Sequence, residues 1–183
     1  MESISSGNAN APATKVGDRE NRMNSLIAAV SQPLASRWAP IPIRLMVGYG
    51  FMQHGFAKLS RGPDTFAAIL KAIGVPMPHV MAWITVLTEL FGGLAVLIGA
   101  FLPLVSVPLI ALLLVAALTV HLPYGFSSIK LMSVTAGRAQ FGPPGYECDL
   151  LYLACLVALV CAGAGPLSVD EYRMRKRGTR TAL

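Results

Sequence analysis

The sequence predicts an all-α integral membrane protein, built as a four-helix bundle with a short interfacial helix between its first two spans. Two observations lead to this fold class. Only 13% of the 183 residues are charged and 54% are hydrophobic, whereas a soluble domain carries about 25% charged residues. The apolar residues also gather in four stretches of roughly 18–22 residues, the length of helix that crosses the hydrocarbon core of a bilayer.

The predicted spans are residues 40–59, 80–101, 103–121 and 148–165. Together they form a membrane domain of residues 37–170, which follows a disordered cytoplasmic segment, residues 1–36, and precedes a basic cytoplasmic tail, residues 171–183. The N-terminal segment has no apolar core behind a basic start, so it does not resemble a cleavable signal peptide.

Lysine and arginine crowd the two ends of the chain and are sparse between the spans. The ends contain Lys15, Arg19, Arg22, Arg37, Arg173, Arg175, Lys176, Arg177 and Arg180. The connections after the first and third spans hold Lys58, Arg61, Lys71, Lys130 and Arg138. Because cytoplasmic segments carry the excess of basic residues, both termini are predicted to lie in the cytoplasm, which agrees with an even number of spans. The net charge of +6 also suits anionic lipid headgroups beside the tail.

The connections between the spans differ in kind. Residues 64–74 carry apolar side chains at helical spacing and end at glycine and proline, which predicts a short helix lying in the outer interface. The second and third spans are joined by almost nothing and should form a tight antiparallel hairpin, in which Pro108 bends the third span without breaking it. Residues 122–147 form a long, glycine-rich extracytoplasmic loop that can fold over the outer mouth of the bundle.

Glu89 is the one charged residue of the second span. A carboxylate near mid-membrane is costly unless it faces a partner or a polar cavity. On the first span, Arg44, His54 and Lys58 share one helical face. Glycines on both spans allow close approach, so these faces are predicted to meet. A rise of about 1.5 Å per residue lets Arg44 reach Glu89 from one side and His54 from the other.

The outer half of the bundle is therefore expected to enclose a polar pocket. His121, ending the third span, and Glu147, preceding the fourth, come to the level of Lys58. Histidines and buried carboxylates titrate near neutral pH when their surroundings perturb them, which makes Glu89, His54 and His121 candidate proton-exchange groups. Quinone reduction needs such groups, because it takes up protons and requires donors to the carbonyl oxygens. The predicted quinone- or substrate-binding residues are Arg44, His54, Lys58, Glu89, His121 and Glu147.

These residues also have structural interpretations. Arg44 and Glu89 are consistent with one buried ion pair that fixes how two helices pack. His54 and His121 are consistent with hydrogen-bonded histidines at the interface, and for Lys58 alone extension to the lipid headgroups is the favoured interpretation. Two histidines on different helices could ligate haem, but their levels differ by about 6 Å, which disfavours opposed ligands.

Other chemistry has little support. Cys148, Cys155 and Cys161 lie on or beside the fourth span without Cys-x-x-Cys spacing, so neither a redox dithiol nor a metal site is indicated, and they are predicted to be packing residues. There is no P-loop and no dinucleotide-binding fingerprint, so no cofactor is expected to be bound by a motif. The basic cluster lacks an aromatic platform, and nucleic acid is not an expected partner.

Six short segments follow one another in order between residues 40 and 170. They are Arg44 and residues 54–59 (HGFAKL), 89–94 (ELFGGL), 121–126 (HLPYGF), 145–147 (GYE) and 165–170 (GPLSVD). In this order they closely resemble the DoxX family of small four-helix membrane proteins. The resemblance implies a multi-pass protein of the bacterial plasma (inner) membrane, in a group named for a quinone-linked thiosulfate oxidoreductase subunit, with relatives tied to oxidative-stress defence. Residues 141–145 (FGPPG) depart from the family's pattern.

The resemblance and the polar residues together favour a membrane subunit of a quinone-linked oxidoreductase complex, related to sulfur-compound or oxidative-stress chemistry. Quinone would be its substrate, and a soluble or membrane oxidoreductase partner would carry the electron-donating cofactor. The alternative is a non-enzymatic anchor that assembles soluble redox enzymes through the basic tail, residues 171–183. A small transporter is less favoured because four spans are few and no inverted repeat is visible, although a homo-oligomer could supply more helices.

Overall fold

The structure is a computed structural model that describes the backbone of residues 33–181 and the side chains of residues 36–176. Most of the segment predicted to be disordered, residues 1–32, lies outside this range. Its last residues, 33–36, form the start of helix α2 instead. The helices are α2 (Pro33–Trp38), α3 (Pro40–Ser60), α4 (Pro63–Ala72), α5 (Pro78–Leu87), η1 (Thr88–Gly92), α6 (Gly93–Ile98), α7 (Leu102–Ala116), η2 (Ala117–His121), η3 (Leu122–Tyr124), α8 (Glu147–Ala162) and α9 (Val169–Thr181). The described chain is mostly helical, as predicted.

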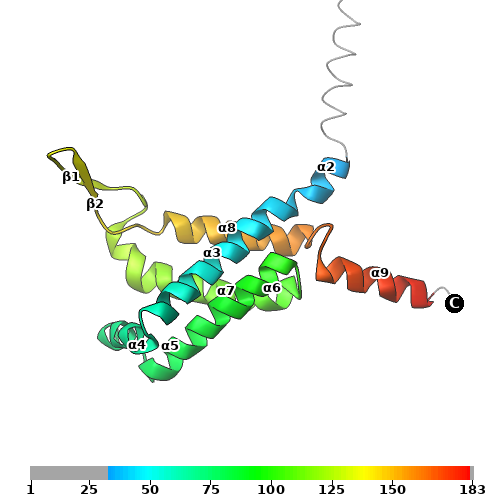
Figure 1. Cartoon of the computed structure of the whole chain (residues 1–183), viewed down its shortest axis with the longest axis horizontal. Helices are drawn as coiled ribbons and strands as arrows, with labels where there is room; N and C mark the ends of the chain where they lie inside the picture. Colours follow the sequence, from blue (N-terminus) through cyan, green and yellow to red (C-terminus); the bar gives the residue numbers. More distant parts are fainter. Residues whose placement is uncertain (1–32, 182–183) are drawn as a thin grey trace, which may run out of the picture. The chain divides into compact units, whose positions relative to one another are not determined.

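The helix α3 coincides with the first predicted span and packs along the rod formed by α5, η1 and α6 (Figure 1). The contact is close because glycine lies on both sides of it. A Cβ atom added at Gly48 would lie 2.6 Å from the backbone N of Leu97 and 2.7 Å from the carbonyl O of Gly93. The glycine-bearing faces of the two helices therefore meet, as predicted from small residues at helix contacts.

The helix α7 continues through η2 and η3 as one run, Leu102–Tyr124. Only three residues separate it from α6, so the predicted tight hairpin is present. Gly99 ends α6 with a φ of +66°, a left-handed conformation that glycine adopts without strain. Pro108 lies inside α7, and the helix is not broken there.

A shared apolar core lies between α3, α6, α7 and α8. Its most deeply buried members come from each of these helices: Val47, Phe51, Val96, Leu102, Leu109, Leu156 and Leu159. The outward surface is apolar as well. Met46, Phe91, Leu104 and Leu118 are between 63% and 71% exposed, a pattern typical of a surface in contact with lipid rather than water.

In the described part of the chain, two helical runs are long and apolar enough to cross a bilayer by length and composition. They are Pro78–Ile98 and Leu102–Tyr124. The fourth predicted span corresponds to the 16-residue helix α8, which is shorter than predicted and, like α3, is not one of these two runs. α4 matches the predicted short helix, and it packs on α5 through Ala67, Leu70 and Ala82.

The long loop before α8 differs from the prediction. It contains an antiparallel hairpin of β1 (Leu131–Thr135) and β2 (Arg138–Phe141), which stands apart from the packed helices in Figure 1. The predicted all-α class is therefore wrong for this loop. The loop was expected to be irregular because its glycines and prolines dominate the pattern, while the short alternation that forms the strands is weak. At the C-terminal end, α9 begins at Val169, before the predicted boundary between the membrane domain (ending at residue 170) and the tail (beginning at residue 171).

Candidate functional site

Glu89 forms an ion pair with Lys58. The Lys58 Nζ atom lies 2.6 Å and 2.7 Å from the two carboxylate oxygens, and the Glu89 side chain is only 10% exposed. The predicted contact of Arg44 with Glu89 is therefore wrong, and so is the interpretation that Lys58 extends to the headgroups. Glu89 therefore has the cationic partner that it requires, but this partner is Lys58 and not Arg44, which lies on the same face of α3.

Two of the predicted titratable groups lie in π-helical turns. Glu89 belongs to η1 and His121 to η2. A π-turn inserts an extra residue into an α-helix and changes the direction of the side chains that follow, and such turns are frequent at functional sites. The two turns aim Glu89 and His121 at the space between α3, α7 and α8.

His121 is paired with Asp149, a residue that the sequence analysis did not select. The His121 Nδ1 atom lies 2.6 Å from an Asp149 carboxylate oxygen, and the Asp149 side chain is 10% exposed. Asp149 sits two residues after Glu147, which had been selected instead. Neighbours two apart on a helix point in nearly opposite directions, so only one of the two carboxylates can face the helix bundle.

A backbone clamp holds the start of α8 against the end of α7. The amides of Gly145, Tyr146 and Glu147 donate to the carbonyls of residues 125–127 at distances of 3.0–3.1 Å. A Cβ atom at Gly145 would collide with the Gly125 carbonyl oxygen, so only glycine fits at this approach. The clamp brings Asp149 to His121 and places the last residues of the loop, Pro144 and Gly145, beside them.

The Lys58–Glu89 ion pair and the His121–Asp149 hydrogen bond line one cavity of about 380 Å³, within the range of small-molecule sites. The residues around it come from α3, η1, α7, η2, α8 and the loop: Phe51, His54, Lys58, Glu89, Leu112, Leu113, Ala116, His121, Pro144, Gly145, Cys148, Asp149 and Tyr152. Four of the six predicted binding residues are among them. The walls are largely apolar, with the polar groups concentrated on α3, η1 and α8.

His54 and Tyr152 add hydrogen-bonding capacity that the protein itself does not use. Their rings stand edge to face with centroids 6.3 Å apart, and within the described part of the chain neither side chain makes a hydrogen bond or an ion pair. The Tyr152 hydroxyl lies against Gly50, where a Cβ atom would collide with it. Tyr152 was missed because an isolated tyrosine in an apolar span carries no signal in the sequence.

A smaller cavity of about 220 Å³ adjoins the first one. It lies between α3 and α4 and shares His54 and Lys58 with the larger cavity. The Lys58 Nζ atom is 5.2 Å from the centre of the Phe66 ring of α4. Lys58 therefore stands where the two cavities adjoin.

Two of the predicted site residues lie elsewhere. Arg44 is buried and donates to the carbonyl oxygens of Ala164 at 2.8 Å and Leu167 at 3.1 Å, so it joins α3 to the segment after α8. The Glu147 carboxylate accepts a hydrogen bond from the backbone N of Ser128 at 2.9 Å and is not part of the cavity wall. Both act as ties between chain segments.

Replacing Arg44 with methionine should destabilise the protein by about 3 kcal/mol or more, because two hydrogen bonds from a charged donor are lost and buried carbonyls remain unpaired. Denaturation of the purified protein in mixed micelles measures this change. Arg61→Met, at an exposed arginine after α3, is the matched control and should change stability by less than about 0.5 kcal/mol. Equal effects of the two substitutions would contradict the structural role of Arg44.

Comparison with known proteins gives a family match for part of the chain. The family model described as DoxX matches residues 39–122, the region that contains Lys58, Glu89 and His121. The match ends before α8, which contributes Asp149 to the cavity. No curated protein and no solved structure is significantly similar to the chain. Residues 39–122 thus match DoxX, a family of membrane proteins, and the two helices able to cross a bilayer agree with that match.

Proposed function

We propose that this chain is the membrane subunit of a quinone-linked oxidoreductase complex and that the cavity between α3, η1, α7 and α8 receives the quinone ring. A partner oxidoreductase, with sulfur-compound or oxidative-stress chemistry, supplies the electrons. In this proposal α3, α5–α6, α7 and α8 are four spans of a bacterial plasma membrane protein, and both termini are cytoplasmic.

The observation that carries the proposal is that each carboxylate on the cavity wall already has a side-chain partner. Glu89 pairs with Lys58, and Asp149 shares a short hydrogen bond with His121. A charged ligand would have to displace one of these pairs at a cost in desolvation. A neutral ring with polar carbonyl oxygens, bound among apolar side chains, fits such a site better.

The same groups suit the protons that quinone reduction consumes. Reduction to the quinol takes two electrons from the partner and two protons from the surroundings, and the protons bind to the two ring oxygens. His54 and Tyr152 can donate hydrogen bonds to a carbonyl oxygen, since neither uses its donor within the described protein. The His121–Asp149 pair lies next to Pro144 and Gly145 of the loop before α8 and can pass a proton inward.

In this proposal the quinone ring enters the cavity from the lipid. The smaller cavity between α3 and α4 meets the larger one at His54 and Lys58. Quinones with long apolar tails travel within the bilayer, so a side opening between helices suits them better than an opening to water.

Quinone binding can be tested with the purified full-length protein in lipid nanodiscs and a photoreactive short-chain quinone. We expect labelling to be competed by unlabelled quinone and located on α3 and α8. Tyr152→Phe removes one hydroxyl and should weaken binding by roughly twofold to tenfold, the range for one hydrogen bond. Gln53→Leu, on α3 but outside the cavity wall, should leave binding unchanged. Labelling that is not competed, or equal binding by both variants, would overturn the proposal.

The alternative, a non-enzymatic anchor, has one supporting observation. α9 exposes basic side chains such as Arg173 and Lys176, which can recruit an acidic partner. In that case a redox enzyme would still co-purify with variants of Tyr152 and would be lost when residues 171–183 are deleted. A quinone-linked subunit predicts instead that the Tyr152 variant alters quinone-dependent activity of the assembled complex.

The proposed orientation predicts which thiol faces the outside of the cell. Cys148 is exposed at the start of α8. A membrane-impermeant maleimide should label it in intact cells when Cys155 and Cys161 are replaced by alanine. In a cysteine-free chain, Lys176→Cys on α9 should be labelled only after the membrane is permeabilised. The opposite pattern would reverse the orientation. Labelling of both sites in intact cells with a sealed membrane would exclude a single span between them.

A further inference from the structure

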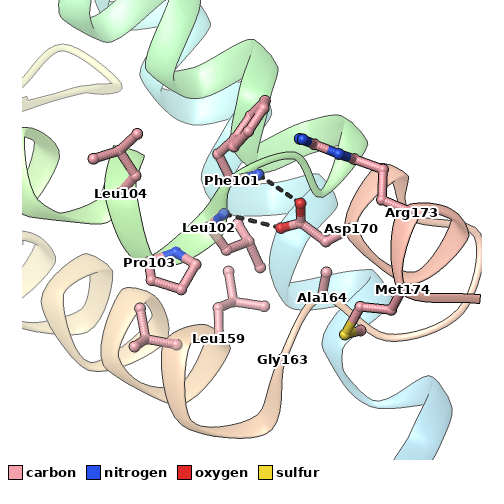
Figure 2. A pocket seen from close by; sticks show the side chains of 11 residues that line it. Phe101, Leu102, Pro103, Leu104, Leu159, Gly163, Ala164, Asp170, Arg173 and Met174 are labelled. Carbon is pink, nitrogen blue, oxygen red and sulfur yellow. Dashed lines mark hydrogen bonds between the residues drawn. The ribbon is translucent and has the colours of Figure 1, made fainter. Parts of the chain in front are cut away.

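A second open cavity lies at the other ends of α7 and α8, where α9 begins (Figure 2). Its volume is about 540 Å³, and it shares no wall residue with the cavity of the functional site. Apolar side chains such as Leu104, Leu159 and Val160 form most of its wall, and Asp170 and Arg173 form its polar end. We call this cavity the α7–α9 groove.

Asp170 is fully occupied in holding α9 to the turn before α7. Its two carboxylate oxygens accept hydrogen bonds from the amides of Phe101 at 2.9 Å and Leu102 at 3.1 Å, as Figure 2 shows. The Asp170 amide donates to the carbonyl of Gly99 at 3.0 Å. The amides at the start of α7 are thus already capped, and the carboxylate stabilises this positive helix end.

Arg173 is the available cation of the groove. Its guanidinium carbon lies 4.3 Å from the centre of the Phe101 ring, and within the described part of the chain it makes no ion pair. Stacking on the ring uses the face of the guanidinium group and leaves its in-plane N–H donors free. These donors match the oxygens of a phosphate group.

The surroundings of the groove favour a lipid. Leu104 is 71% exposed and Val160 is 39% exposed, so the apolar wall opens onto the surface that faces the bilayer. From residue 170 to residue 177 the chain carries four basic and two acidic side chains. Basic pockets beside membrane helices are typical binding sites for anionic headgroups.

We propose that the α7–α9 groove binds one anionic phospholipid. The phosphate accepts hydrogen bonds from Arg173, and an acyl chain lies between α7 and α8 along Leu104 and Val160. The bound lipid fixes α9 at the membrane surface. This proposal depends on the membrane location of the helices and not on quinone binding.

Native mass spectrometry of the purified full-length protein tests the proposal, with phosphatidylglycerol and phosphatidylcholine of identical acyl chains added at equal concentration. We expect phosphatidylglycerol to be retained in preference to phosphatidylcholine. Arg173→Gln should lower the affinity for phosphatidylglycerol about fivefold, the effect of one basic residue near the membrane surface, and should leave phosphatidylcholine unchanged. Arg138→Gln, at an exposed arginine of β2, is the matched control and should change neither.

A second variant tests the acyl-chain contact without altering charge. Leu104→Trp fills the groove and should lower retention of phosphatidylglycerol, while circular dichroism shows whether each variant stays folded. Equal retention of the two lipids, or unchanged retention in Leu104→Trp, would overturn the proposal even if Arg173→Gln does not fold. Displacement of the lipid by excess inorganic phosphate would identify the ligand as a free anion and would also overturn it. Quinone labelling of the functional site should be the same in all of these variants.

Discussion

Lys58→Met should destabilise the protein by about 3 kcal/mol or more, since removing one partner of a buried ion pair leaves the other uncompensated. Glu89→Leu should cost less. The Glu89 side chain is 10% exposed and that of Lys58 is 24% exposed. A lone ammonium on its long flexible stem can therefore turn toward water or headgroups, whereas a lone carboxylate on the shorter, more buried Glu89 side chain cannot. Denaturation of each variant in mixed micelles measures the difference.

The double variant Lys58→Met with Glu89→Leu separates stability from function. Replacing a buried pair with apolar residues of similar size is often neutral for stability, so the double variant should recover most of the stability lost by Lys58→Met. It should not recover quinone-dependent activity, because two of the polar groups on the cavity wall are gone. A double variant that is no more stable than the weaker single variant would show that the two side chains are not energetically coupled.

Gly48→Ala should destabilise the packing of α3 on α6 by about 3 kcal/mol or more, at the upper end of the cost of overfilling a packed interface. The added methyl group would lie 2.6 Å from the Leu97 amide nitrogen and 2.7 Å from the Gly93 carbonyl oxygen. Both are backbone atoms of a helix, so relief requires the two helices to separate. Thermal denaturation in detergent, followed by circular dichroism, measures the loss.

Gly92→Ala is the matched control on the opposite helix run. A methyl group there would meet only the Leu109 side chain, at 3.1–3.3 Å, and that side chain can move by the few tenths of an ångström required. The intrinsic gain of alanine over glycine in a helix, up to about 1 kcal/mol, should offset this cost. If Gly48→Ala proves as mild as Gly92→Ala, the contact between α3 and α6 is looser than the structure indicates.

The partner of Glu89 illustrates what a sequence can and cannot predict. Arg44 and Lys58 lie on the same face of α3, so a helical projection does not distinguish them. The register between the two helices distinguishes them. With Gly48 against Gly93 and Gly55 against Leu90, Arg44 lies level with Gly99, far along the helix from Glu89, while Lys58 lies within reach of it.

The pairing of His121 with Asp149 depends on how the loop before α8 closes. His121 was selected from the sequence, but its partner was not, because Glu147 and Asp149 both stand at the start of α8. Their directions are set by the clamp between residues 125–127 and 145–147, which joins segments separated by the β1–β2 hairpin. Contacts of this kind depend on how a long loop closes, and a single sequence does not specify that closure.

Composition and apolar periodicity were enough to predict α3, α4, the two helical runs Pro78–Ile98 and Leu102–Tyr124, and α8, but not α2 or α9. They also predicted the tight turn between α6 and α7 and the need of Glu89 for a cationic neighbour, since these follow from local geometry and from the cost of an unpaired charge in lipid. The tertiary structure alone decided that Lys58 is that neighbour, that Asp149 pairs with His121, and that Arg44 joins α3 to the end of α8. These outcomes depend on helix register, on the two π-turns and on loop closure, which are set by packing between distant segments rather than by any local stretch of residues.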